Sequence, residues 1–240
     1  MGRAPADAGR VRDAGGRDAV EPRMKPPQGR VVALAGATGL VGSALLRGLL
    51  GDASVAKIHA LGRRRPDVRH PKLVPQVVDF AALPALQPLD EVYLALGTTI
   101  RAAGSQPAFR AVDFDASLAL ARAARAAGAR RAGLVSAMGA DARSRIFYSR
   151  VKGELEEAVA ALGFEGLVIA RPSLLLGERA GLGQESRRLE ELGMIAGRLL
   201  GGLVPRHHRP IAAEAVAAAL LARVPVARGT ELLLSGDMQS

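Results

Sequence analysis

Short apolar segments alternate with segments in which apolar residues recur at helical spacing, from about residue 30 to the end of the chain. We predict strands at 30–36, 56–62, 73–80, 91–97, 131–137, 166–172 and 231–236. The helical spacing predicts helices at 40–50, 115–128, 148–162 and 212–223. Because the strands are almost continuously apolar, helices should cover both faces of the sheet. The pattern therefore predicts an α/β fold, a doubly wound parallel sheet of about seven strands.

The ends of this pattern predict how the chain is organised. Residues 1–28 mix Gly, Pro and charges without apolar periodicity, so we expect a disordered leader, and Met24 is an alternative start to Met1. Residues 29–240 should form one domain. Within it, residues 173–209 follow the sixth predicted strand, are less regular and are rich in arginine, which predicts a substrate lid. Their charge favours a small anionic substrate as a hypothesis.

Composition narrows the class of protein. The chain has no cysteine, which excludes disulfides and thiolate chemistry. No apolar run reaches the length of about 18 residues that a membrane span needs, and no secretory signal is evident, so we expect a cytoplasmic protein that is not integral to a membrane. The net charge is +10, but the arginines are scattered and no aromatic residues accompany them. We therefore expect no nucleic-acid partner, no metal at the basic segment 206–209, and a monomer or homodimer.

A glycine-rich turn follows the first predicted strand. The sequence GATGLVG occupies residues 36–42, between that strand and the first helix. Glycine lets a pyrophosphate approach backbone N–H groups, and the helix dipole favours its negative charge. The context predicts a dinucleotide site.

The loops after later strands predict which dinucleotide binds. Arg63 and Arg64 follow the second strand, where an NADP site places arginine against the 2′-phosphate, so we expect NADPH. Asp79 could accept the adenine amino group, and the segment ALGTT (95–99) follows the fourth strand at the ligand-binding edge of the sheet. The predicted cofactor-binding residues are Gly36, Thr38, Gly39, Leu40, Val41, Gly42, Arg63, Arg64, Asp79, Gly97, Thr98, Thr99, Lys152 and Pro172.

A tyrosine and a lysine are spaced for one helix face. Tyr148 and Lys152 lie four residues apart, which points both side chains into one cleft. An ammonium group near a phenol favours the phenolate, which can exchange a proton with a carbonyl or alcohol. Ser136, at the end of the fifth strand, could hold the substrate oxygen. We predict these three as the catalytic residues.

The motif order resembles the short-chain dehydrogenase/reductase superfamily, with its Rossmann fold. The segments ALGTT, LVSAMGAD, FYSRVKGELE and IARPSLLLGER look like its atypical branch, which includes the Tat-interacting tumour-suppressor oxidoreductase. The resemblance implies NADPH at the C-terminal edge of the sheet, Tyr148 as proton donor or acceptor, Lys152 on the nicotinamide ribose and Ser136 polarising the substrate. It also places Pro172 beside the nicotinamide.

The sequence departs from that family at three points. A single hydroxyl is present at Ser136-Ala137, and Pro172-Ser173 stands where many members have Pro-Gly. The family's tetrad asparagine is not evident, and Asp113 and Asp115 occur in that region instead. We predict an NADPH-dependent oxidoreductase that transfers hydride to or from a small carbonyl or alcohol. The alternatives are a non-catalytic NADP-binding sensor and a nucleotide-sugar epimerase or dehydratase.

Overall fold

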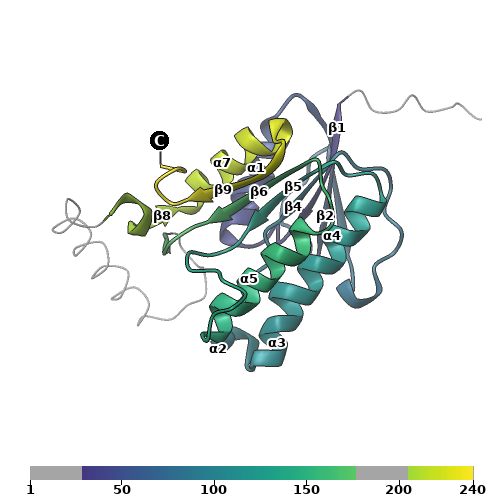
Figure 1. Cartoon of the computed structure of the whole chain (residues 1–240). Helices are drawn as coiled ribbons and strands as arrows, with labels where there is room; N and C mark the ends of the chain where they lie inside the picture. Colours follow the sequence, from purple (N-terminus) through teal and green to yellow (C-terminus); the bar gives the residue numbers. More distant parts are fainter. Residues whose placement is uncertain (1–28, 177–204, 240) are drawn as a thin grey trace, which may run out of the picture.

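The computed structural model describes residues 29–176 and 205–239 and contains a seven-stranded parallel sheet (Figure 1). The strand order is β3-β2-β1-β4-β5-β6-β9, and every neighbouring pair is parallel. The strands are β1 (Arg30–Ala35), β2 (Val55–Gly62), β3 (Leu73–Val77), β4 (Glu91–Leu94), β5 (Arg131–Val135), β6 (Gly166–Arg171) and β9 (Gly229–Leu234). The sequence prediction of a doubly wound sheet is confirmed. The predicted leader lies outside the described residues, as does most of the predicted lid.

Helices cover both faces of the sheet, as the apolar strands require. One face carries α1 (Leu40–Gly51) and α7 (Ala213–Arg223), and the other carries α4 (Ser117–Ala126) and α5 (Phe147–Ala160) (Figure 1). The helical turns η1 (Phe80–Ala82), η3 (Arg206–His208) and η4 (Val224–Val226) lie in the connections.

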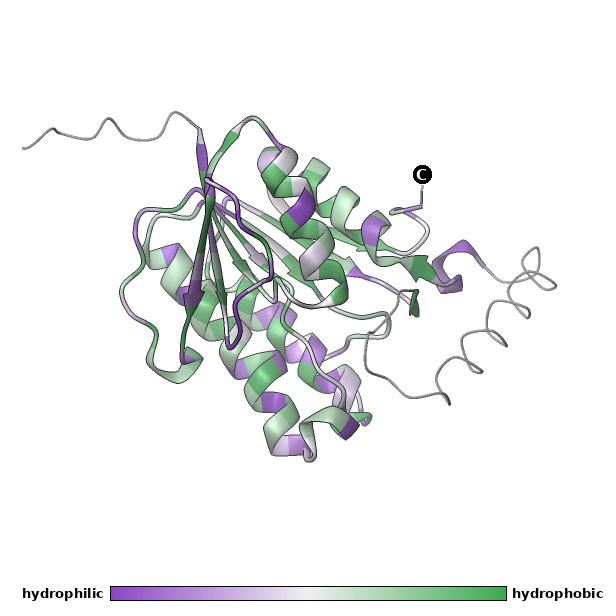
Figure 2. Ribbon diagram, turned by 180° about the vertical axis from the view of Figure 1, so that it is seen from behind, coloured by the Kyte–Doolittle hydropathy of each residue, from purple (hydrophilic) through white to green (hydrophobic). Residues whose placement is uncertain are grey.

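The core is aliphatic and has two parts, one on each side of the sheet. On the α1 side, Leu45 and Leu220 pack against the strands and are fully buried, and on the α5 side Leu120 and Leu155 do the same. Figure 2 shows the hydrophobic colour concentrated on the central strands, whereas the helices carry both colours. This rigid sheet fixes the positions of the loops at its edge.

Two irregular regions were not predicted. Before α4, the chain forms α2 (Ile100–Ala103), α3 (Gln106–Arg110) and a π-helical segment, η2 (Ala111–Ala116). The Ser105 hydroxyl accepts from the Ala108 N–H and starts α3, with a proline in its first turn. The second region is a small parallel pair of β7 (Leu175–Leu176) and β8 (Ile211–Ala212). Both regions adjoin the edge where the candidate site lies.

Candidate functional site

The site lies at the C-terminal edge of the sheet, where the chain turns after each parallel strand. The glycine-rich turn follows β1, the arginines follow β2, the ALGTT segment follows β4, and Ser136 follows β5. Open α/β sheets bind ligands at this edge. The predicted residues are therefore brought to one side of the molecule.

The three glycines of the first turn serve different purposes. Gly36 has φ +83°, and a Cβ there would lie 2.2 Å from the Ala95 carbonyl oxygen. A Cβ on Gly42 would lie 1.9 Å from the Gly36 carbonyl oxygen, so both positions are required by the packing of the chain on itself. A Cβ on Gly39 would meet only the Gly36 oxygen, at 3.4 Å. The space beside Gly39 is thus left open rather than filled by the protein.

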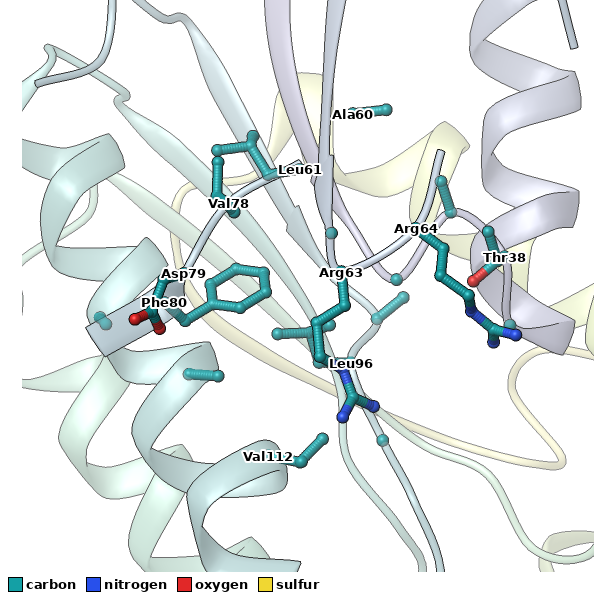
Figure 3. Close-up of a pocket in the computed structure, with 18 of the residues that line it drawn as sticks. Thr38, Ala60, Leu61, Arg63, Arg64, Val78, Asp79, Phe80, Leu96 and Val112 are labelled. Carbon is teal, nitrogen blue, oxygen red and sulfur yellow. The ribbon is translucent and has the colours of Figure 1, made fainter. Parts of the chain in front are cut away.

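That space belongs to a cavity of about 600 Å³ that runs from the glycine turn to the ends of β2 and β3. In the close-up of Figure 3, Arg64 lies on the Thr38 side, Asp79 and Phe80 lie on the opposite side, and Arg63 lies between them. The predicted residues in its lining are Gly36, Thr38, Gly39, Arg63, Arg64, Asp79 and Gly97. The predicted cofactor-binding residues outside its lining are Leu40, Val41, Gly42, Thr98, Thr99, Lys152 and Pro172, and the predicted catalytic residues Tyr148 and Ser136 also lie outside it.

The charged groups of this cavity are arranged for an anion at one end. Arg63 and Arg64 are exposed, and neither forms an ion pair within the described part of the chain. Asp79 is partly engaged, because its Oδ1 accepts from the Ala81 N–H at 2.9 Å and caps η1. The sequence reasoning missed Phe80 and Asp115 as cavity residues. Phe80 offers an aromatic face, and its place next to Asp79 was the available signal.

Lys152 is held by a buried carboxylate. Its Nζ lies 2.6 Å from Asp113 Oδ1, and the two side chains are only 5% and 1% exposed. The other oxygen of Asp113 accepts the Thr98 N–H at 2.9 Å, which ties the segment after β4 to the same group. Asp113 comes from the π-helical segment η2 and Lys152 from α5. A direct ion pair therefore occupies the region where the family's asparagine was not evident.

Tyr148 lies one turn before Lys152 on α5 and is half-buried. Its ring packs against the fully buried Phe109, with ring centroids 5.5 Å apart. The chain's other tyrosine, Tyr93, is fully buried on β4, and its hydroxyl donates to Glu91 at 3.2 Å. Burial raises the pKa of Tyr93 far above its ordinary value. Tyr148 is thus the tyrosine available for proton transfer at this edge.

Ser136 begins the loop that packs against the same helix. Its loop contacts α5 through Gly153, where a Cβ would lie 2.1 Å from the Ala142 nitrogen, and the Asp141 N–H donates to the Ser149 carbonyl at 3.0 Å. The Ser136 hydroxyl is buried, and no hydrogen-bond partner for it occurs within residues 29–176 and 205–239. A buried hydroxyl without a partner is costly unless something else bonds to it. Its environment therefore suits a ligand oxygen.

The ends of the predicted lid are anchored beside this loop. The Met138 N–H donates to the Pro172 carbonyl at 2.9 Å, so Pro172 lies next to the serine loop. The Ser173 N–H donates to Ser235 Oγ at 2.7 Å, and the Ser173 hydroxyl donates to the Arg209 carbonyl. With β7 pairing β8, the chain leaves and returns at neighbouring points.

Residues 29–176 and 205–239 contain neither a candidate metal centre nor a candidate membrane-spanning helix. No cluster of three His, Asp or Glu side chains there could hold a metal ion. Within the same ranges, no helix is both long and apolar enough to cross a membrane.

The comparisons with known proteins agree on the fold. No family model matches the chain. An oxidoreductase of the short-chain dehydrogenase/reductase family from Burkholderia thailandensis superposes with a TM-score of 0.64 at 20% identity, covering 90% of this chain and 94% of that one. The structure of MoeE5 in complex with UDP-glucuronic acid and NAD gives a TM-score of 0.64 at 20% identity, over 84% of this chain and 75% of that one. At these identities the likeness shows the fold alone, a Rossmann-type parallel α/β sheet.

The curated relatives correct one prediction. The mitochondrial protein fmp52 of Emericella nidulans is 38% identical over 180 residues, which is 71% of this chain and 76% of the relative. The prediction of a cytoplasmic location is wrong, because the relatives in Emericella and Aspergillus are named as mitochondrial proteins. That prediction rested on the lack of an evident secretory signal and of long apolar segments. These criteria argue against secretion and membrane insertion, but they do not distinguish a protein of the cytosol from one of an organelle. By this identity and coverage, the chain belongs to the family of the Fmp52 proteins.

Proposed function

We propose that this protein is an NADPH-dependent oxidoreductase of the short-chain dehydrogenase/reductase type, which transfers hydride to or from a small carbonyl or alcohol. The observation that carries the proposal is the buried Lys152 ammonium, fixed by Asp113 one turn after Tyr148 at the ligand-binding edge of the sheet. A buried lysine beside a half-buried tyrosine is an arrangement suited to acid/base chemistry. We also propose that the protein belongs to the atypical branch of that superfamily, which includes the Tat-interacting tumour-suppressor oxidoreductase.

The residues fit a nicotinamide dinucleotide. The opening beside Gly39 and the uncapped start of α1 suit a pyrophosphate, which backbone N–H groups there would bind. Arg63 and Arg64, free of ion pairs among the described residues, suit a 2′-phosphate, and this supports NADPH over NADH. Asp79 keeps one carboxylate oxygen for the adenine amino group. When bound, the cofactor supplies or accepts the hydride.

The chain's own residues handle the proton and the substrate oxygen. In reduction, the Ser136 hydroxyl donates a hydrogen bond to the substrate carbonyl, and Tyr148 Oη gives its proton to that oxygen as the alcohol forms. Lys152 has three N–H donors, which would serve a ribose hydroxyl and stabilise the phenolate while the ammonium stays paired with Asp113. In oxidation the proton returns to Tyr148. The predicted lid, residues 173–209, lies mostly outside the described residues, and its arginines favour an anionic substrate.

The test is a screen of aldehydes, ketones and alcohols with NADPH and NADH, run on the wild type and Tyr148→Phe. We expect turnover with NADPH and a loss in kcat of about 10²–10⁴-fold in the variant, with NADPH affinity unchanged. The matched affinity shows that the variant is folded and loaded. If NADPH binds tightly and no compound is turned over, the protein is a dinucleotide sensor and the oxidoreductase proposal fails.

A second candidate is a nucleotide-sugar epimerase or dehydratase. It is favoured by the likeness to MoeE5, whose structures hold NAD with UDP-glucuronic acid or UDP-glucose. An epimerase returns the hydride to its substrate, so the cofactor shows no net turnover. Incubation with UDP-sugars, followed by chromatography of the products, separates the two: a converted sugar without net NADPH consumption supports the epimerase.

A further inference from the structure

The connection from β3 to β4 lacks the helix that covers a parallel sheet elsewhere. After η1, residues 83–89 run as an irregular segment to β4, with prolines at 84 and 88. Proline lacks the N–H that a helix interior needs, so this segment cannot close into a regular helix. It covers β1, β2 and β3 on the α4 side, where His59, Leu61 and Leu89 point. An irregular loop covers this face of the sheet less completely than a helix would.

A second hollow of about 490 Å³ lies between the segment and the strands, within the ~300–1,000 Å³ range of ligand pockets. Its walls are mainly apolar and include Pro75, Val78 and Leu86. Leu61 and Val78 also line the dinucleotide cavity, so the two hollows are neighbours that share a wall.

A buried imidazole faces this hollow with one nitrogen unsatisfied. His59 lines it and is 6% exposed, and its Nε2 has no hydrogen-bond partner within the part of the chain that is described. Its Nδ1 lies 3.3 Å from the Gln76 amide nitrogen. Burial, with the nearby Lys57, lowers the pKa of His59, so the ring stays neutral at neutral pH. His59 therefore adds a neutral, buried ring to the wall of the hollow.

Among the lining residues, the one charged side chain is cationic. Arg65 lines the hollow and is exposed, and it forms no ion pair with any described residue. No aspartate or glutamate is among the lining residues. A full positive charge therefore stands beside apolar side chains with no competing acid. We propose that this hollow is a second ligand site, separate from the dinucleotide cavity, that binds a small organic monocarboxylate with an apolar body.

In this site the carboxylate pairs with Arg65, and the apolar body lies along Pro75 and Leu86 towards the ring of His59. The guanidinium fork matches a carboxylate with two charge-assisted hydrogen bonds. The site does not depend on the catalytic proposal, because none of these residues belongs to the predicted catalytic set.

The test is calorimetric titration of the full chain with benzoate and hexanoate, with benzamide and hexanamide as neutral partners of the same shape. We expect one acid to bind with a Kd of about 1 mM or tighter, and its amide to bind at least tenfold more weakly. Arg65→Gln should weaken the acid about tenfold. Arg69→Gln, an exposed arginine of the same loop outside the lining, and Arg64→Gln, which lines the other cavity, should leave it unchanged.

The imidazole is tested separately, since a variant of a buried histidine can fail to fold. The ring resonances of His59, one of four histidines, should shift on titration in the wild type, because the apolar body of the ligand lies towards the ring. The proposal is overturned if neither acid binds at about 10 mM, if the amides bind as well as the acids, or if Arg69→Gln weakens binding as much as Arg65→Gln.

Discussion

Asp113→Asn should destabilise the protein strongly, because it leaves the Lys152 ammonium buried without a counter-charge. The substitution keeps an oxygen for the Thr98 N–H and so isolates the effect of charge. At 2.6 Å and an effective dielectric constant of ~20, the attraction between the two groups is about 6 kcal/mol. Desolvation offsets part of this attraction, and removing one partner of such a pair typically costs about 3–5 kcal/mol. We expect the free energy of unfolding to fall by about 3 kcal/mol.

The assay is urea unfolding followed by circular dichroism, combined with a double-mutant cycle. Lys152→Met and the double variant complete the cycle, and the double variant should be at least about 2 kcal/mol more stable than the sum of the single losses predicts. Asp115→Asn is the matched control, because Asp115 is exposed two residues later and should change stability by about 0.5 kcal/mol or less. A loss below about 1 kcal/mol in Asp113→Asn, or an additive cycle, would refute the reasoning.

Three further predictions follow from the cavities and the turn. Gly42→Ala should unfold the protein or lower its free energy of unfolding by several kcal/mol, as measured by chemical unfolding. Gly39→Ala should change the free energy of unfolding by no more than about 1 kcal/mol. In a fluorescence titration, Gly39→Ala should bind NADPH about tenfold more weakly than the wild type. In the double variant Arg63→Ala/Arg64→Ala, the affinity for NADPH should fall at least tenfold more than the affinity for NADH. Equal losses of affinity for both dinucleotides would show that these arginines do not bind the 2′-phosphate. The pKa of His59 is lowered in the folded protein, so the unfolded chain takes up the proton first as the pH falls. The contribution of His59 to stability is therefore present above pH ~6.5 and is lost below it. The fall in unfolding free energy from pH 7 to 5 should be smaller in His59→Gln than in the wild type.

The strands were predictable because a doubly covered sheet imposes a simple pattern. A strand buried on both faces, such as β6, is apolar at nearly every position and stands out from amphipathic helices. The end of β3 was less readable. Its apolar run continues to Phe80, but Asp79 caps η1 and the strand stops at Val77. Local side-chain hydrogen bonds decided that boundary, and hydrophobicity did not report them.

The pair of Asp113 and Lys152 shows what the sequence could not provide. The two residues are 39 positions apart, and nothing in their spacing joins them. They meet because η2 has π-helical geometry at Asp113 and because α5 packs beside it, which are properties of the packed structure. The sequence did show that an aspartate was present where the resemblance leads one to expect asparagine. That departure marked Asp113 as unusual, but only the folded structure showed that it pairs with Lys152.

The arginines after β2 show why a run of like residues should not be read as a unit. Arg63, Arg64 and Arg65 are consecutive, and composition alone favours three solvated side chains in an arginine-rich protein. Once β2 ends at Gly62, the turning backbone sends the first two to the dinucleotide cavity and the third to the neighbouring hollow. If both proposals hold, Arg64→Gln and Arg65→Gln remove the same charge one residue apart and yet affect different ligands, the dinucleotide in one case and the carboxylate in the other. The two hollows share Leu61 and Val78, so a ligand bound in one hollow can change the affinity of the other hollow for its own ligand. By thermodynamic linkage, each ligand must then change the affinity for the other by the same factor.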